Sequence, residues 1–386
     1  MKNLRVAIVH DYIKEYGGAE RVLEALCVAY PDAPIYTAFY QAGSAAHERF
    51  KHKKIIPSWV HYIPYFSTKL HSPLRFLAPQ IWGSFDFAKY DVVIGSASWY
   101  VTKGFNKPFD SAQGKWFIEI CYCHTPPRWL YGYRTSVEWQ RFWPVKVYGM
   151  IVGHFMRMYD FNAAQKVDYF IANSKDVQAR IKKFYRRDST VIYPPVSLGA
   201  KSKGLGTRDK DYYFIVARIV GGKGLELAVE AAKKLGIKLK IAGAPAGYYT
   251  GHKQLQEDAA DNVEFLGHVT DEELVGLYSG AKAFLALATD EDFGITPVEA
   301  MLCGTPVIAY YGGGYKETVI DGKTGVFFHE ATVSSLTEAI RKLETLRQAQ
   351  GKKMEKACKK QAEKFSKDRF IREIKQFVTA KVKENV

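Results

Sequence analysis

Cysteine is scarce in this sequence of 386 residues, where five cysteines lie scattered along the chain. An odd and scattered set argues against a disulfide framework and fits a reducing cytosol. Cys121 and Cys123 alternate on one predicted strand, but no second pair supplies a tetrahedral metal site. Structural thiols are the better interpretation, since free cysteine is commonly buried.

Long apolar runs are absent too, and none approaches the roughly 20 residues that a membrane-spanning helix needs. Hydrophobic residues make up 47% and charged residues 25% of the chain, which is the balance of a globular protein. The opening MKNLRVAIVHDY holds a short apolar stretch without a small-residue cleavage site and leads directly into a predicted strand. We expect a cytoplasmic protein that is not exported.

Two nucleotide-binding fingerprints are also missing. No loop matches GxGxxG, the dinucleotide motif, or GxxxxGK[ST], the phosphate loop. Their absence weakens an assignment to NAD or ATP chemistry.

Acidic residues are outnumbered, since 40 Asp or Glu face 55 Lys or Arg, for a formal charge of +15. Nucleic acid, an anionic membrane surface or an anionic substrate would each account for this excess. Residues 352–386 hold twelve Lys or Arg against five acids. Residues 51–90 combine six Lys or Arg and nine aromatic residues with one acid. This mixture suits a lipid interface or a stacked nucleic acid, although much of it can be core.

The chain is long enough for two domains, since single domains cluster at roughly 100 to 200 residues. Almost fully apolar strands alternate with helical patterns, and the alternation restarts after a polar, glycine-rich stretch at 189–211 that we interpret as a linker. Such strands indicate parallel sheets covered on both faces. The expected strands are 4–9, 34–39, 90–98, 116–124 and 167–174 before this stretch, and 212–219, 239–245, 263–269, 283–288, 306–310 and 325–328 after it.

We therefore predict one domain at 1–195, a second at 196–365, and a C-terminal helix at 366–386 that packs back toward the first domain. The helix has one apolar face, which is more often packed on the protein than on a membrane. This face comprises Phe370, Ile371, Ile374, Phe377 and Val378. In such sheets ligands bind outside the carboxyl ends of the strands.

Charged residues gather at these predicted strand ends. Arg218 closes one strand and Lys223 lies just before a helix, while EDFGITPVEA places Glu291 and Glu299 between a strand and a helix. A helix N-terminus offers unpaired N–H groups that attract phosphate. A nucleotide sugar would satisfy both kinds of group, with its diphosphate on the cations and N–H groups and its hydroxyls on the carboxylates. Each residue taken alone is as readily explained as a surface or first-turn charge.

Glycines and a histidine mark three further strand ends. Gly17 and Gly18 allow close approach of a ligand, though paired glycines are commonly only a turn. His124 ends a strand before Thr-Pro-Pro, where a histidine is either structural or part of a site. The three glycines at 312–314 before Glu317 could equally form a tight connection.

Together these stretches resemble the retaining glycosyltransferases of the group 1 family. Its fold is the α/β GT-B fold, in which two Rossmann-like domains face each other across a cleft. The most specific match is the family's Glu, seven residues, Glu signature with Phe-Gly after the first acid, met here by Glu291, Phe293, Gly294 and Glu299. The GGAE loop at 17–20, the Arg-to-Lys spacing at 218–223 and GGGYKETVIDGKTG also fit.

The resemblance implies a role for each matching position. Arg218 and Lys223 would bind the donor diphosphate, Glu299 the ribose, and Glu291 the transferred sugar. His124 would lie near a sugar hydroxyl. The other positions implied for donor binding are Gly17, Gly18, Val269, Phe293, Gly294, Ile295 and Thr296, with Gly18 near both the phosphate and the acceptor.

CHTPPRWLY further resembles a branch that builds bacterial surface polysaccharides and often uses GDP-mannose. The resemblance implies a glycan or lipid-linked acceptor, a first domain on the acceptor side, a second that binds the nucleotide sugar, and retention without a firmly assigned protein nucleophile. Together with the basic and aromatic segment at 51–90 and the basic tail at 352–386, it predicts peripheral attachment to the anionic inner face of a membrane. No nucleic-acid partner, cofactor or metal is expected.

Three alternatives stay open. Asp290, Glu291 and Asp292 could bind a divalent metal beside a diphosphate, although Arg218 and Lys223 already supply positive charge. A nucleotide-sugar epimerase or a phosphorylase could use the same cleft. A basic nucleic-acid-binding protein would explain the charge of +15 but not the paired glutamates.

Overall fold

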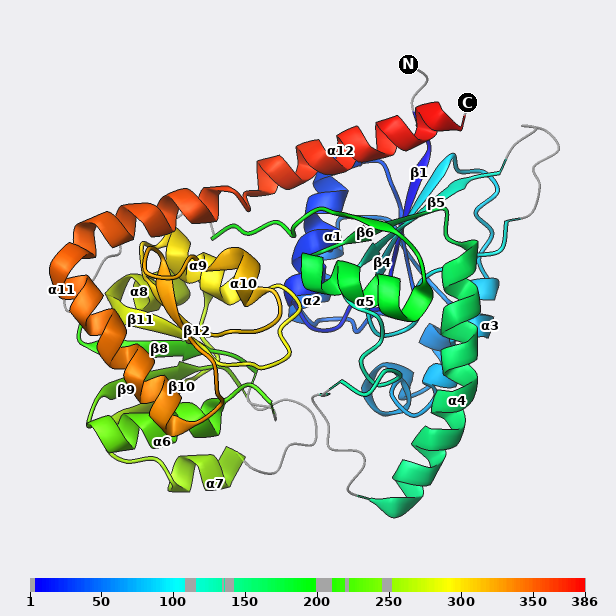
Figure 1. Cartoon of the computed structure of the whole chain (residues 1–386). Coiled ribbons are helices and arrows are strands. Elements are labelled where there is room, and N and C mark those ends of the chain that lie inside the picture. The colour runs from blue at the N-terminus through cyan, green and yellow to red at the C-terminus, as the bar shows by residue number, and fades with distance from the viewer. Residues whose placement is uncertain are drawn as a thin grey trace. The chain divides into compact units, whose positions relative to one another are not determined.

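The computed structural model describes residues 4–107, 116–133, 135, 142–198, 210–218, 222–244 and 252–385. The chain divides into two compact units, each built around a parallel sheet (Figure 1). Met1–Tyr133, Trp143–Pro195 and Lys367–Val386 belong to the first unit, and Val196–Ser366 belongs to the second.

The first unit holds a seven-stranded sheet in the order β3-β2-β1-β4-β5-β6-β7. Its strands are β1 (Val6–His10), β2 (Ile35–Thr37), β3 (Ile55–Pro57), β4 (Val92–Ala97), β5 (Ile118–Cys123), β6 (Tyr169–Ala172) and β7 (Ser189–Val191). Successive side chains of a strand point to opposite faces. Val6 and Ile8 of β1 therefore enter one buried cluster, while Ala7 and Val9 enter another on the opposite face. Both faces of the sheet are covered, as the apolar strands predict.

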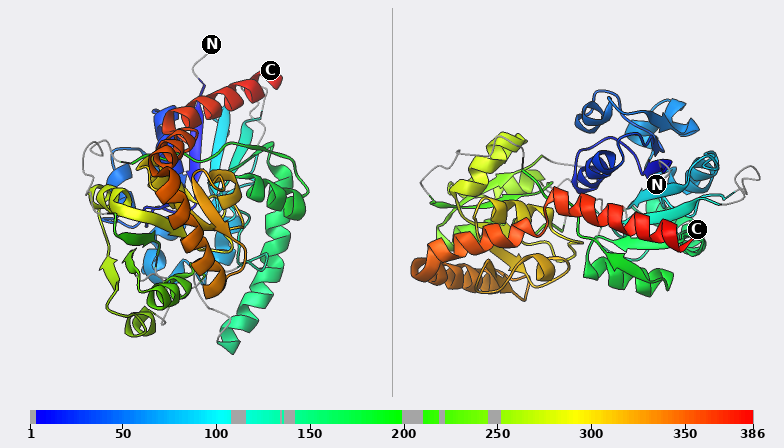
Figure 2. Two further views of the ribbon diagram at one scale, coloured as in Figure 1. Left: turned by 60° about the vertical axis from the view of Figure 1, so that its left-hand side comes forward. Right: turned by 90° about the horizontal axis from the view of Figure 1, so that it is seen from above.

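Helices and short helical turns connect these strands (Figure 2). They are α1 (Gly18–Ala29), α2 (Ala45–Phe50), η1 (Trp59–Tyr62), η2 (Phe66–Leu70), η3 (Arg75–Leu77), α3 (Ala78–Gly83), α4 (Trp143–Lys166), α5 (Lys175–Tyr185) and α12 (Lys367–Glu384). On α12, Phe370, Ile374 and Val378 are buried in the cluster that also holds Val22 of α1. The apolar face of the last helix therefore packs within the first unit.

Strands β3 and β7 were not expected from the sequence. The prediction of a linker beginning at 189 is wrong for its first residues, because Thr190 of β7 pairs with Ile171 of β6. Both missed strands are three residues long and lie at the edges of the sheet. An edge strand needs no continuous apolar run, and it tolerates a proline such as Pro57.

Much of the basic and aromatic segment at 51–90 is core. Phe66, Trp82 and Phe87 are fully buried, whereas other aromatic side chains remain exposed. The exposed ones are Trp59, Tyr62, Tyr65 and Phe76. No helix in the described part of the chain is both long and apolar enough to cross a bilayer.

The second unit holds a six-stranded sheet in the order β10-β9-β8-β11-β12-β13, again parallel throughout. Its strands are β8 (Tyr212–Val216), β9 (Lys238–Ala242), β10 (Val263–Gly267), β11 (Ala281–Ala286), β12 (Val307–Tyr310) and β13 (Gly325–Phe328). Its helices are α6 (Leu225–Leu235), α7 (His252–Glu257), α8 (Asp271–Gly280), α9 (Ile295–Leu302), α10 (Tyr315–Thr318) and α11 (Val333–Glu363). The strand order reverses between β8 and β11, and a ligand crevice is expected at such a switch point.

Candidate functional site

In the second unit, the loops after β8 and β11 carry the residues that the sequence singled out. Arg218 follows β8 and is exposed, and Lys223 lies two residues before α6. Lys223 Nζ donates to Glu291 Oε2 at 2.9 Å. The structure therefore brings Lys223 and Glu291 together at the switch point, 68 residues apart in sequence.

The three glycines at 312–314 hold the loop that carries Glu291. Gly314 N donates to the Glu291 carbonyl at 2.9 Å. Gly313 has a φ of +49°, and a Cβ there would lie 2.0 Å from the same carbonyl oxygen. No L-residue with a side chain could take this place without moving the loop. These glycines are therefore a tight connection that fixes the backbone beside Glu291.

Helix α9 begins at the end of the same loop. Its N-cap, Gly294, has a φ of +87°, and a Cβ there would lie 2.7 Å from the ring of Tyr315. Ile295 and Thr296 form the half-buried first turn, whose N–H groups have no partner within the helix. Phe293 is buried, with its ring centroid 5.4 Å from that of Phe365. In this arrangement Phe293 anchors the loop, while the first turn of α9 offers N–H groups.

Glu299 lies on α9 and is 1% exposed. The hydroxyl of Tyr278 on α8 donates to Glu299 Oε2 at 2.9 Å. Tyr278 is itself buried. A buried tyrosine of the same unit therefore fixes the position of the Glu299 carboxylate.

Val269 follows β10 at the edge of the sheet, with β9 between β10 and β8.

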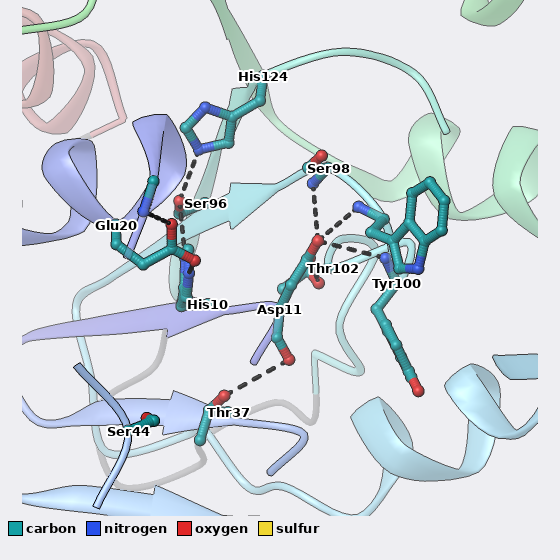
Figure 3. Close-up of polar contacts among 12 residues, drawn as sticks. His10, Asp11, Glu20, Thr37, Ser44, Ser96, Ser98, Tyr100, Thr102 and His124 are labelled. Carbon is teal, nitrogen blue, oxygen red and sulfur yellow. Dashed lines mark hydrogen bonds and ion pairs between the residues drawn. The ribbon is translucent and has the colours of Figure 1, made fainter. Parts of the chain in front are cut away.

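In the first unit, three strands align polar residues at their carboxyl ends (Figure 3). His10 ends β1 and is paired in register with Ser96 of β4, while His124 follows β5. The Ser96 hydroxyl lies 3.0 Å from His10 Nδ1 and 2.9 Å from His124 Nε2. His10 Nε2 lies 3.4 Å from Glu20 Oε1 on α1. A hydrogen-bonded chain thus runs from Glu20 through His10 and Ser96 to His124.

This chain has one consistent order of donors when His10 is neutral. An ionised Glu20 only accepts, so His10 Nε2 carries the hydrogen and Nδ1 accepts from the Ser96 hydroxyl. Ser96 Oγ then accepts from His124 Nε2–H, which leaves a lone pair on His124 Nδ1. Burial lowers the pKa of His124 to about 3. His124 is therefore a neutral imidazole whose Nδ1 can accept a hydrogen bond from a hydroxyl.

Asp11 organises the loop that follows β4, and sequence reasoning missed it. Its carboxylate accepts hydrogen bonds from the backbone N–H groups of Ser98, Trp99 and Tyr100 and from the Thr102 hydroxyl (Figure 3). Burial raises the pKa of Asp11 above its ordinary value. The dipeptide His10-Asp11 directly after an apolar strand was the available signal, because polar residues at strand ends often serve a site.

Gly17 and Gly18 begin α1. Gly17 N donates to Glu20 Oε2 at 2.8 Å, and the backbone of Gly17 is extended. A Cβ at Gly17 would meet nothing closer than Glu20 Oε2 at 3.4 Å, an ordinary contact. The fold therefore does not demand glycine at position 17, in contrast to Gly313, and the space beside it is open to a ligand.

The alternative of a metal at Asp290–Asp292 gains no support. Among the residues that the structure describes, no group of three or more His, Cys, Asp or Glu side chains could hold a metal ion.

Comparisons with known proteins agree with this geometry. Residues 200–365 match the family model described as Glycosyl transferases group 1, and residues 16–199 match that described as Glycosyltransferase Family 4. The D-inositol 3-phosphate glycosyltransferase of Mycobacteroides abscessus is 29% identical over 197 residues, 46% of this chain and 44% of that protein. That of Mycolicibacterium smegmatis is 31% identical over 180 residues, 42% of this chain and 41% of that protein. The chain spans less than half the length of these curated relatives.

Solved structures show the same fold. Anabaena Alr3699/HepE in complex with UDP and glucose has a TM-score of 0.69 at 17% identity, covering 98% of this chain and 100% of that chain. Sucrose-phosphate synthase from Thermosynechococcus elongatus has a TM-score of 0.68 at 19% identity, covering 97% and 98%. With two parallel-sheet units and family matches from residue 16 to residue 365, the chain has the GT-B fold and belongs to the group 1 glycosyltransferases.

Proposed function

We propose that the protein transfers a sugar from a nucleotide-sugar donor to a glycan or lipid-linked acceptor, with retention of anomeric configuration. The observation that carries this proposal is the Lys223–Glu291 pair beside the first turn of α9, at the switch point of the second sheet. A cation, free N–H groups and a carboxylate meet there, as a sugar diphosphate requires.

Breaking the sugar–phosphate bond leaves negative charge on the departing nucleoside diphosphate while the anomeric carbon becomes cation-like. Lys223, Arg218 and the N–H groups of Ile295 and Thr296 would stabilise the leaving diphosphate. The same groups make a metal ion unnecessary in this proposal.

The contact between Lys223 and Glu291 gives the two residues linked roles. In the absence of donor each is the partner of the other. A bound diphosphate competes for Lys223 with a charge-assisted hydrogen bond, and Glu291 is then released to accept from a hydroxyl of the transferred sugar. Glu299, held by Tyr278, would accept from the ribose hydroxyls.

The first unit would supply the acceptor side. His124 Nδ1, kept unprotonated by the chain through Ser96, would accept from a hydroxyl of the transferred sugar. The open space beside Gly17 would let the phosphate and the acceptor approach the backbone of Gly17 and Gly18. We assign no protein base, because the departing phosphate can take the proton of the acceptor hydroxyl on the same face.

Guanine is the base we propose, with GDP-mannose as donor, on the strength of CHTPPRWLY at 123–131. The solved neighbour from Anabaena binds UDP, so a UDP-sugar is the competing donor. We also propose peripheral attachment to the anionic inner face of a membrane, supported by the charge of +15 and the exposed aromatic side chains within 51–90.

Release of nucleoside diphosphate with and without acceptor tests the reaction. Acceptor-dependent release of GDP from GDP-mannose, unchanged by excess EDTA, is expected. Donor conversion without any acceptor, giving an epimeric nucleotide sugar, would indicate an epimerase. Release that needs inorganic phosphate would indicate a phosphorylase, and loss in EDTA that magnesium restores would refute the metal-free reaction.

A further inference from the structure

Helix α4 leaves an unusual amount of apolar surface uncovered. Trp143, at its first residue, is 76% exposed, and Met150, Ile151 and Phe155 are each more than half exposed. Val145, Val147, Tyr148 and Met158 are exposed as well. The first turns of α4 extend beyond the other elements of the first unit in Figure 1 and in the left view of Figure 2.

These side chains cover more than half of the circumference of the helix. At about 100° per residue, the six apolar side chains exposed between 143 and 151 leave one sector open, roughly 140° wide, and Lys146 points into it. They are Trp143, Val145, Val147, Tyr148, Met150 and Ile151. An apolar arc wider than half of the helix circumference is stable only when its surroundings are apolar over a similar width. A flat protein partner would cover one side of this helix end, whereas a lipid leaflet would enclose it.

The charged residues of this part of α4 also favour a lipid leaflet as the partner. Between residues 142 and 159 the sequence contains Lys146 and Arg157 and no acid. Both cations are exposed. Tryptophan and tyrosine prefer the headgroup level of a bilayer, and cations beside them attract anionic lipid. The nine residues 143–151 rise about 13 Å, enough to pass the headgroups of one leaflet without spanning the bilayer.

Helix α4 is also anchored to the first unit. The Tyr148 hydroxyl donates to the Pro73 carbonyl, and Val152 and Tyr159 pack against a buried cluster of the first unit. These contacts attach the inserted turns firmly to the folded unit, so insertion of the turns would hold the whole unit at the membrane.

We propose that the first turns of α4, residues 143–151, insert into the outer part of an anionic lipid leaflet and are the main membrane anchor of the chain. This rests on the proposed peripheral attachment and names the element responsible for it. It does not depend on which sugar is transferred. An acceptor carried by a lipid would then be presented to the first unit at a fixed distance from the bilayer.

Sedimentation with vesicles tests the proposal. Wild-type protein should bind phosphatidylcholine vesicles containing an equal part of phosphatidylglycerol, and bind phosphatidylcholine alone more weakly. The double variant Trp143→Ser, Ile151→Ser should lose binding by about a hundredfold, roughly tenfold for each inserted side chain. Lys146→Glu should weaken binding only to the anionic vesicles.

A matched control removes the same kinds of side chain elsewhere in the first unit. Trp116 and Val28 are each about half exposed and lie outside α4. The double variant Trp116→Ser, Val28→Ser should bind vesicles as the wild type does. An equal loss in both double variants, or no binding by the wild type, would overturn the proposal.

A second copy of the chain is the competing occupant. If the wild type is a concentration-dependent dimer that Trp143→Ser, Ile151→Ser converts to a monomer without any lipid binding, α4 is a protein interface and the proposal is wrong. Thermal stabilisation by GDP-mannose should be equal in wild type and variant. A failure of that stabilisation in both proteins would count against the proposed donor and leave the lipid result intact.

Discussion

Replacing Lys223 with alanine tests the charge balance at the leaving group. Lys223 is 30% exposed and pairs with Glu291 at 2.9 Å. A partly exposed pair of this kind contributes about 1 kcal/mol or less to folding, so Lys223→Ala should change stability little. In the transition state the leaving oxygen gains charge, and losing one well-placed donor there costs about 3 kcal/mol. That energy corresponds to a turnover roughly a hundredfold lower, at 1.36 kcal/mol per factor of ten.

Steady-state release of nucleoside diphosphate measures this effect. We expect the fall in kcat to exceed the rise in KM, because the cation matters most when the bond breaks. Lys240 is a matched control, since it is also 30% exposed and pairs with Glu264 at 3.1 Å in the same unit. Lys240→Ala should leave kcat unchanged.

Two results would contradict a special role for Lys223 in the transition state. If Lys223→Ala and Glu291→Ala lower the unfolding temperature equally and leave kcat untouched, the pair is structural. A rise in KM alone would mean that Lys223 binds donor and transition state equally well.

Further predictions concern the ribose, the tautomer and pH. Glu299→Ala should raise the donor KM about tenfold and leave kcat nearly unchanged. Tyr278→Phe removes the hydrogen bond but keeps the carboxylate, so it should raise KM less. An equal rise of KM in both variants would mean that altered packing, and not the lost carboxylate, weakens donor binding. In Ser96→Ala, His124 should no longer be held in a single tautomer, and nitrogen NMR of labelled histidine should detect a mixture of the two tautomers. An unchanged spectrum would refute the hydrogen-bonded chain through Ser96. Burial raises the pKa of Glu119 from 4.5 to about 7. The folded state then holds a proton that the unfolded state releases, so the unfolding free energy should fall by about 3 kcal/mol as pH rises from 4.5 to 7. Urea unfolding of Glu119→Gln should lack this fall, and parallel pH profiles for the two proteins would contradict it.

The sequence was sufficient where a residue's role depends on its neighbours along the chain. Apolar runs predicted strands in both units, and Glu291 and Glu299 could be placed around a strand-to-helix junction because both elements lie within a few residues. The edge strands β3 and β7 were missed because each is three residues long, which is too short for a repeating pattern to mark it.

Contacts that depend on strand register could not be read from the sequence. Ser96 joins His10 to His124 only because β1, β4 and β5 are neighbours in the sheet with aligned ends. The buried pair Lys103–Asp160 joins residues 57 apart, and nothing local to either marks the other as its partner. The glycines at 312–314 were left open between site and turn, and their close packing against the Glu291 backbone favours the tight connection.

Thermal shift with GDP, UDP, ADP and their sugars is the most direct test of the central claim that the second unit binds a nucleotide sugar. A donor at 100 times its dissociation constant should stabilise the protein by about 2.7 kcal/mol. We predict the largest shift with GDP-mannose and a smaller one for Glu299→Ala at the same concentration. A clear preference for UDP-sugars would contradict the guanosine donor, and no shift with any nucleotide sugar would contradict the claim itself.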